Sequence, residues 1–153
     1  MKLRILLIAM LGMFAVSCEK GATNEQNPID QPVDNNKNAI ILYTTEDGNP
    51  IKLIVTEGFG GNLISHTDGK IVFDNDVVAL PNEAFKDCNT LKLILLPNCV
   101  KTIGEYTFEG CSNITSIIIP ESMESISGCA FVGCTKLKEF KGKYASANGY
   151  CLV

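Results

Sequence analysis

The chain has 153 residues, of which 46% are hydrophobic and 20% are charged, and its formal net charge at pH 7 is −4. This size and composition fit one globular domain. The basic residues form no stripe of the kind that follows a phosphate backbone, so we do not expect nucleic acid as a partner.

Residues 1–17 have the pattern of a secretory signal peptide. Lys2 and Arg4 provide a positive start, an apolar run follows, and small residues precede Cys18. The sequence AVSC at 15–18 resembles the lipobox of bacterial lipoproteins, which implies that Cys18 is lipidated and anchors the chain to a membrane. The alternative is a secreted protein in which Cys18 is unmodified.

Residues 18–38 are predicted to be the lipidated cysteine and a flexible tether. The segment after Cys18 is rich in Asn, Asp, Gln and Pro and has only Ile29 and Val33 as large apolar residues. Such a segment cannot bury enough surface to order itself. A flexible chain of this length reaches about 25 Å, which would hold the folded part away from the lipid headgroups.

Residues 39–74 are predicted to form a small antiparallel β cap. Its apolar runs lie at 40–43, 51–55, 62–65 and 70–73. Asp47-Gly48 separates the first two runs and predicts a hairpin between them. A cap is expected because the open end of a repeat array would expose apolar core and unpaired strand edges.

Residues 75–153 are predicted to be repeats with a period of 23 residues. The positions that recur at this spacing are Phe85, Phe108 and Phe131, then Cys88, Cys111 and Cys134, then Leu91, Ile114 and Leu137. A fixed period of this length indicates a solenoid, in which each unit buries its apolar side against its neighbours. The period already begins inside the predicted cap, because Ile71 precedes Ile94 by one period.

Each repeat is predicted to contain a parallel strand and a short helical turn. The strands run through 91–96 and 114–119, and Pro97 and Pro120 end them because proline cannot donate to a strand ladder. The phenylalanine and the cysteine of each unit are three residues apart, which places them on one face of a helical turn. The predicted fold is therefore a β-rich solenoid with an N-terminal antiparallel β cap.

The sequence IGEYTFEGCSNITSIIIP at 103–120 resembles the BspA-like leucine-rich repeats of surface proteins from Bacteroides and relatives. The segments ILYTTEDGNP at 41–50 and FGGNLIS at 59–65 resemble the unit that precedes those repeats. The resemblance implies a leucine-rich-repeat solenoid and a non-catalytic, adhesion-type surface lipoprotein. It also implies an outer-membrane location and a host or bacterial protein or glycan as ligand. The alternative is a structural or vestigial surface antigen without a dedicated ligand, and the oligomeric state is left open.

Seven cysteines in an exported protein raise the question of disulfides. Equivalent positions on stacked coils lie about one strand spacing apart, but their Cβ bonds run parallel, which suits burial and not bridging. We therefore expect Cys88, Cys111 and Cys134 to be small buried core residues. Any disulfide is expected to involve the cysteines outside the pattern, whose pairing is left open: Cys99, Cys129 and Cys151.

The sequence offers no constellation for catalysis or metal binding. His66 is the one histidine, carboxylates are not clustered, and neither C-x-x-C nor H-x-x-x-H occurs. We therefore expect no enzyme activity, no metal site and no cofactor. Asn113-Ile114-Thr115 matches a glycosylation sequon, but the bacterial leader and the inward position of Ile114 make this a chance match.

A binding surface is expected on the outward side of the repeat strands, where side chains alternate with those of the core. The outward positions stack as Leu93, Ser116 and Glu139, and as Leu95, Ile118 and Lys141. Leu93, Leu95 and Ile118 are apolar where solvent would favour polar residues, which is typical of a contact patch. The alternative is an ordinary surface, because exposed aliphatic residues are common and branched ones favour strands.

The sequence ends with the apolar residues YCLV at 150–153, which look like the opening of another strand. We expect a C-terminal end that is truncated or uncapped, because few repeats are present and a short array is only marginally stable. Residues 144–153 should then exchange their amide hydrogens faster than residues 114–119.

Overall fold

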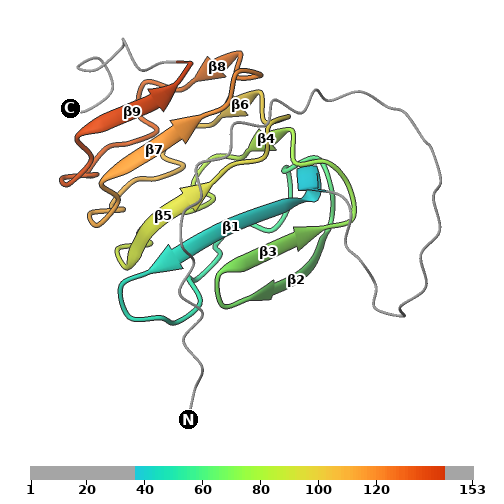
Figure 1. Cartoon of the computed structure of the whole chain (residues 1–153), viewed down its shortest axis with the longest axis horizontal. Helices are drawn as coiled ribbons and strands as arrows, with labels where there is room; N and C mark the ends of the chain where they lie inside the picture. Colours follow the sequence, from blue (N-terminus) through green and yellow to red (C-terminus); the bar gives the residue numbers. More distant parts are fainter. Residues whose placement is uncertain (1–36, 144–153) are drawn as a thin grey trace.

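The computed structural model describes residues 37–143 (Figure 1). The predicted signal peptide, Cys18, all but the last two residues of the predicted tether, and the C-terminal segment with Cys151 lie outside the described residues. The described part is rich in β structure and poor in helix. Its elements are η1 (Lys37–Ala39), β1 (Ile40–Thr45), β2 (Leu63–Thr67), β3 (Lys70–Phe73), β4 (Ala79–Leu80), β5 (Leu91–Leu95), β6 (Thr102–Ile103), β7 (Ser116–Ile119), β8 (Ser125–Ile126) and β9 (Glu139–Gly142).

The first strands form a four-stranded sheet in the order β2-β3-β1-β5, in which each strand is antiparallel to its neighbours. The hairpin expected at Asp47-Gly48 is wrong, because residues 51–55 form no strand. Both edges of β1 are already occupied, one by β3 and the other by β5, so no edge is left for residues 51–55. Ile51 instead buries its side chain in the core.

β1 lies between β3 and β5, although the 23-residue period links Ile71 of β3 with Ile94 of β5. Ile41 pairs with Ile71 on one side of β1, and Tyr43 pairs with Ile94 on the other. Because β3 and β5 are both antiparallel to β1, they run in the same direction without touching along a ladder. The early part of the chain thus adds a strand that the repeat pattern does not contain.

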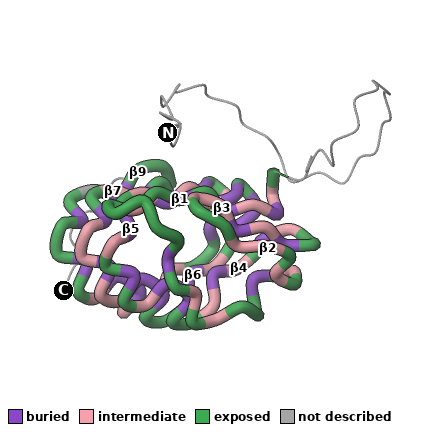
Figure 2. The backbone as a smooth tube through the Cα atoms, turned by 90° about the horizontal axis from the view of Figure 1, so that it is seen from below, coloured by how far each residue is buried: buried purple, intermediate pink, exposed green. Residues whose placement is uncertain are grey.

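The remaining strands form two parallel sheets, β4-β6-β8 and β7-β9. The paired residues are one period apart, as in Leu80↔Ile103↔Ile126 and Ile117↔Phe140. β5 contacts β7, so β9, β7, β5, β1, β3 and β2 lie side by side across the molecule (Figure 1). β4 and β6 lie on the opposite side of the fold from β1 and β3 (Figure 2).

A column of phenylalanine rings runs through the core between these two sides. Phe85 and Phe108 stack with centroids 5.3 Å apart, and Phe108 and Phe131 stack at 5.2 Å with an interplanar angle of 3°. Phe59 and Phe140 close the two ends of the column with edge contacts at 6.3 and 5.1 Å. The rings are parallel because equivalent positions of successive turns repeat the same backbone geometry.

The helical turns expected around the phenylalanines are turns rather than helices. Their hydrogen bonds span three residues, as from Cys88 N to the Phe85 carbonyl at 3.2 Å. Positive φ angles at Glu83 (61°), Asp87 (59°) and Tyr106 (57°) interrupt any helix there. Successive turns are instead tied to each other by backbone bonds such as Phe85 N to the Thr107 carbonyl at 2.8 Å.

Candidate recognition surface

The predicted outward positions lie on three neighbouring strands: Leu93 and Leu95 on β5, Ser116 and Ile118 on β7, and Glu139 and Lys141 on β9. Ser116 pairs with Glu139 and Ile118 with Lys141, so both stacks exist between β7 and β9. β5 lies beside β7 and carries Leu93 and Leu95 one period earlier.

Alternation along these strands separates the outward residues from the core. Ile94, Ile117 and Ile119 are buried, whereas the side chain of Ile118 is 42% exposed. Figure 2 shows the same mixture of buried and exposed positions along the chain. Leu93 and Leu95 are less exposed than Ile118 because β1 lies beside them. Thr44 is opposite Leu93 in this register, and Leu42 is opposite Leu95.

Leu42 is an outward residue of this surface that the sequence analysis missed. Its side chain is 40% exposed, while its neighbours Ile41 and Tyr43 are buried. Residues 40–43 are all apolar, so no alternation in this run marks Leu42 as outward, and the pairing of β1 with β5 could not be read from the sequence. We call Leu42, Leu93, Leu95 and Ile118 the aliphatic face.

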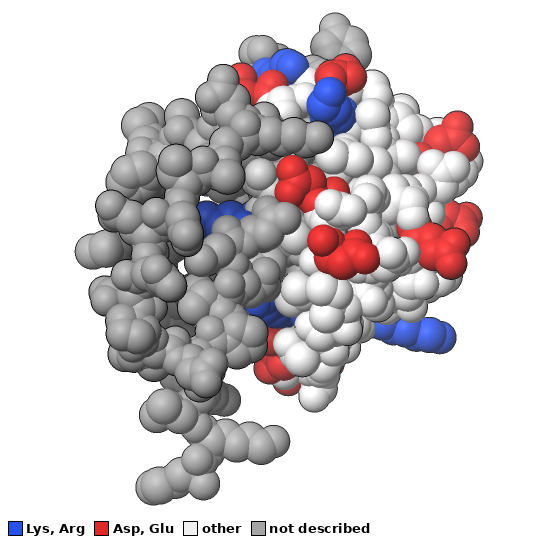
Figure 3. All heavy atoms as spheres, turned by 90° about the vertical axis from the view of Figure 1, so that its right-hand side faces the viewer, with Lys and Arg blue, Asp and Glu red and all other residues white. Residues whose placement is uncertain are grey.

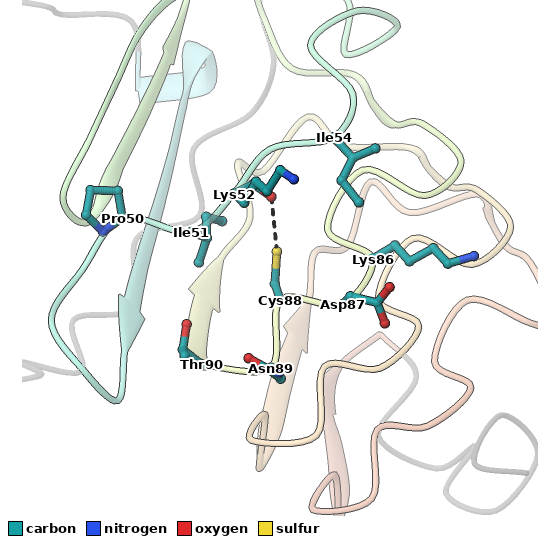
Figure 4. A pocket seen from close by; sticks show the side chains of 9 residues that line it. All are labelled: Pro50, Ile51, Lys52, Ile54, Lys86, Asp87, Cys88, Asn89 and Thr90. Carbon is teal, nitrogen blue, oxygen red and sulfur yellow. Dashed lines mark hydrogen bonds between the residues drawn. The ribbon is translucent and has the colours of Figure 1, made fainter.

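A second candidate is a hollow of about 300 Å³ between the loop at 50–54 and the turn at 86–90 (Figure 4). Its residues are Pro50, Ile51, Lys52, Ile54, Lys86, Asp87, Cys88, Asn89 and Thr90. The Cys88 Sγ donates to the Lys52 carbonyl at 3.5 Å, and burial raises the pKa of this thiol to about 11. A protonated, hydrogen-bonded thiol is a poor nucleophile. Cys88 therefore gives the hollow no reactive group, and its hydrogen bond holds the loop at 50–54 against the turn at 86–90.

Cys88, Cys111 and Cys134 are buried, as predicted, and are free thiols. They also donate hydrogen bonds, which the sequence analysis did not foresee. The Cys111 Sγ donates to the Phe85 carbonyl at 3.0 Å and the Cys134 Sγ to the Phe108 carbonyl at 3.1 Å. Burial raises the pKa of Cys134 to about 11 and raises that of Cys111 as well. Cys111 and Cys134 therefore tie successive turns together as neutral thiols, whereas Cys88 ties the first turn to the loop at 50–54.

Cys99 and Cys129 are also free thiols in the described part, while Cys151 lies outside it. Cys99 is buried, and its Sγ donates to the Val77 carbonyl at 3.5 Å. Cys129 is partly exposed. A disulfide that involves Cys151 stays a prediction, because Cys151 lies outside the described residues.

His66 contacts Tyr43 across the antiparallel sheet. The Tyr43 Oη lies 2.8 Å from His66 Nε2 and donates to the Thr67 carbonyl at 2.8 Å. Because a hydroxyl has one proton to give, Nε2 must carry the proton of the neutral imidazole and donate it to Tyr43. Partial burial lowers the pKa of His66. His66 is thus part of a packing contact between β1 and β2.

Asn113, the first residue of the sequence that matches a glycosylation sequon, forms hydrogen bonds through both the nitrogen and the oxygen of its side-chain amide. Its Nδ2 donates to Glu46 Oε2 and to the Asn89 carbonyl, each at 2.7 Å, and its Oδ1 accepts from Lys136. This side chain joins the end of β1 to three successive turns. Its role in the fold is structural.

Charges are dispersed on the side of the fold shown in Figure 3, where acidic side chains lie among uncharged surface. Lys70 and Lys141 instead lie next to the aliphatic face, since Lys70 pairs with Leu42 and Lys141 with Ile118. Within residues 37–143, no helix has the length and apolar character needed to cross a bilayer.

The turns return every 23 residues with phenylalanine, cysteine and leucine or isoleucine at fixed places. This pattern is typical of a leucine-rich-repeat protein. Residues 65–148 match the family model of the BspA-type leucine-rich repeat region, described as six copies, and the chain belongs to that family. The match covers more than half of the chain and confirms the predicted resemblance. No curated protein and no solved structure matches the chain.

The family is consistent with a non-catalytic surface or binding protein, and its members are generally not enzymes and are typically exported or found at the cell surface. The family match does not extend to residues 1–64, which include Cys18. Lipid anchoring and an outer-membrane location therefore stay predictions.

Proposed function

We propose that this protein is a non-catalytic recognition protein of the cell envelope that binds a protein or glycan through its aliphatic face. The observation that supports it most is the gathering of Leu42, Leu93, Leu95 and Ile118 on one side of three adjoining strands. An apolar surface held by a hydrogen-bonded sheet loses little conformational freedom when it binds a partner. It is also the kind of exposed patch that marks interaction sites.

The scaffold proposed for this surface is a short solenoid of 23-residue coils closed by a cap at residues 39–74. Parallel pairs one period apart and the continuous phenylalanine column support the coils. The antiparallel strands β1, β2 and β3 support the cap. The coils would keep the outward residues of successive strands in register.

The proposed location is the outer membrane, with the chain anchored through lipidated Cys18. The support is the signal-like sequence of residues 1–17 and the AVSC sequence before the mature chain. Incorporation of labelled palmitate that is lost in Cys18→Ser, together with processing that globomycin blocks, tests this. An unlabelled chain that is still exported would point to plain secretion.

Recognition is tested by binding of the purified full chain to immobilised extracellular-matrix and bacterial envelope fractions. The triple variant L93S/L95S/I118S should lose saturable binding while its melting temperature changes little. The matched control is I54S/I64S/V78S, which changes three aliphatic residues exposed elsewhere on the fold. Binding that both variants retain would contradict the proposal, and absence of saturable binding by the unaltered chain would favour a structural surface antigen.

A further inference from the structure

The aliphatic face is crossed by one row of five side chains, one from each of five strands. Lys70 pairs with Leu42, and Leu42 pairs with Leu95 on its other side. Ile118 lies one period after Leu95 on the contacting strand β7 and pairs with Lys141 of β9. Residues directly opposite each other in a sheet point to the same side. The row therefore reads Lys70, Leu42, Leu95, Ile118, Lys141.

We infer that this row binds an extended peptide segment with an acidic residue at each end of a short apolar stretch. The inference rests on the proposed recognition function and names the class of its ligand. The centre of the row is aliphatic, and both ends carry a lysine. Acidic side chains at the ends of the ligand would complement these charges, and apolar side chains between them would cover Leu42, Leu95 and Ile118.

The spacing of the row sets the spacing within the ligand. Neighbouring strands lie about 4.8 Å apart, so four steps place the backbones of Lys70 and Lys141 about 19 Å apart. An extended peptide advances about 3.3 Å per residue and turns alternate side chains to the same side. Two acidic residues six positions apart would span about 20 Å and face the sheet together. The residues two and four positions after the first acidic one would then meet the aliphatic centre.

A polypeptide fits this row better than a glycan because its centre is aliphatic. Sugar rings are held mainly by stacking on aromatic rings and by dense hydrogen bonding, and Tyr43 on β1 is turned into the core, with 3% of its surface exposed. In the backbone register, Glu139 of β9 pairs with Ser116 and Lys141 pairs with Ile118.

The test uses a blocked heptapeptide with glutamate at its first and last positions, leucine at its third and fifth, and serine elsewhere. It is titrated into the full chain and followed by NMR or fluorescence anisotropy. In the variant K70E/K141E, both lysines become glutamates that repel the terminal glutamates of the peptide. The affinity for this peptide should therefore fall about tenfold. A second peptide with lysine at both ends should show the opposite preference and bind the charge-reversed variant more tightly.

The matched control is K52E/K101E, which makes the same change of charge on the 51–55 loop and beside β6. It should bind the acidic peptide as the unaltered chain does, and the melting temperatures of both variants verify that they are folded. Binding that is insensitive to K70E/K141E, or equally weakened by the control, would overturn the inference. So would competition by a polysaccharide without competition by the acidic peptide.

The two proposals fail in different ways. If envelope or matrix fractions are still captured in a manner that L93S/L95S/I118S abolishes, while the acidic peptide does not bind, only the ligand class is overturned. If neither the fractions nor the peptide binds, the recognition function is overturned with it. If the acidic peptide prefers the unaltered chain and the lysine-ended peptide prefers K70E/K141E, both the recognition function and the ligand class are supported.

Discussion

Cys111 lies between two turns of the chain, where its Sγ donates to the Phe85 carbonyl at 3.0 Å. The same carbonyl accepts from the Cys88 backbone N–H at 3.2 Å. The thiol therefore adds a second bond to an acceptor that is already satisfied. The recurring cysteine combines the size of a small core residue with a donor that reaches the preceding turn.

This arrangement predicts an order of stabilities at position 111. Cys111→Ala loses both the sulfur volume and the hydrogen bond and should lower the free energy of unfolding by about 1–2 kcal/mol. Cys111→Ser keeps a donor and should lose less than Cys111→Ala. Urea denaturation measures both, with the partly exposed Cys129→Ala as the control. A serine variant less stable than the alanine variant would show that the site is purely apolar.

Gly110 has a positive φ of 73°, and a Cβ there would lie 2.6 Å from Asp87 Oδ1. Gly110→Ala should therefore lower the free energy of unfolding by about 1–2 kcal/mol. Gly128→Ala is the matched control, because its Cβ would meet nothing within 4 Å. Thermal melts that show equal losses for the two variants would argue against a conformational cause.

At the scale of elements, β1 decides how the first sheet is built. It pairs with β3 on one edge and β5 on the other, and Tyr43 on β1 reaches His66 and Thr67 on β2 through its hydroxyl. Backbone bonds thus join the three antiparallel strands to the first repeat strand, β5, and side-chain bonds add a further link between β1 and β2. Loss of β1 would leave β5 with an exposed edge.

The contact between Tyr43 and His66 predicts a pH dependence of stability. Partial burial lowers the pKa of His66 below its ordinary value of 6.5, so the unfolded chain takes up a proton before the folded one does. Stability should fall as the pH drops below about 6.5, and His66→Gln should remove this dependence. Asp47 and Asp74 also have lowered pKa values, but they start from 3.8 and titrate at lower pH. Urea melts across this range would contradict the assignment if the slope survives in His66→Gln.

Asn113 predicts a second effect at this scale, because it joins the end of β1 to the repeat turns. Asn113→Asp loses the donor to Glu46 and the Asn89 carbonyl and places a carboxylate beside Glu46. The free energy of unfolding should fall by about 1 kcal/mol. Ser112→Ala, at the neighbouring position, is the control. An unchanged midpoint for Asn113→Asp in chemical denaturation would show that the contact adds nothing.

At the scale of the whole molecule, the phenylalanine column makes the core continuous from Phe59 to Phe140. Each ring packs against the ring of the next turn, so no turn has a core of its own. Stability in such an arrangement comes from contacts between neighbouring units. Removing a central ring should therefore disturb the turns on both sides.

Phe108→Ala should cost about 3–5 kcal/mol, a large part of the total stability of a small domain. Amide hydrogen exchange should show loss of protection in both β5 and β7, which lie before and after this ring in the chain. Ile118→Ala, at a half-exposed position on β7, is the control and should change stability by less than about 1 kcal/mol. A loss of protection confined to one turn would contradict a continuous core.

The sequence by itself determined the repeat and most of its core, because an apolar side chain that returns every 23 residues occupies the equivalent place in successive turns. Phe85, Phe108 and Phe131, and the cysteines three residues after each, could be assigned from spacing alone. The left-handed backbone conformation at Glu83 and Tyr106 could not be assigned from the sequence, since neither residue is typical of positive φ. For this reason the predicted helical turns at Phe85 and Phe108 are single hydrogen-bonded turns that do not extend into helices.

Only the tertiary structure decided that β1 inserts between β3 and β5. Strand neighbours are chosen by backbone hydrogen bonds between distant segments, and these bonds leave no periodic trace in the sequence. The predicted surface contained Leu93, Leu95 and Ile118 because they follow the repeat. Leu42 and Lys70 joined it through the register of β1, which carries the row of outward side chains beyond the first repeat strand.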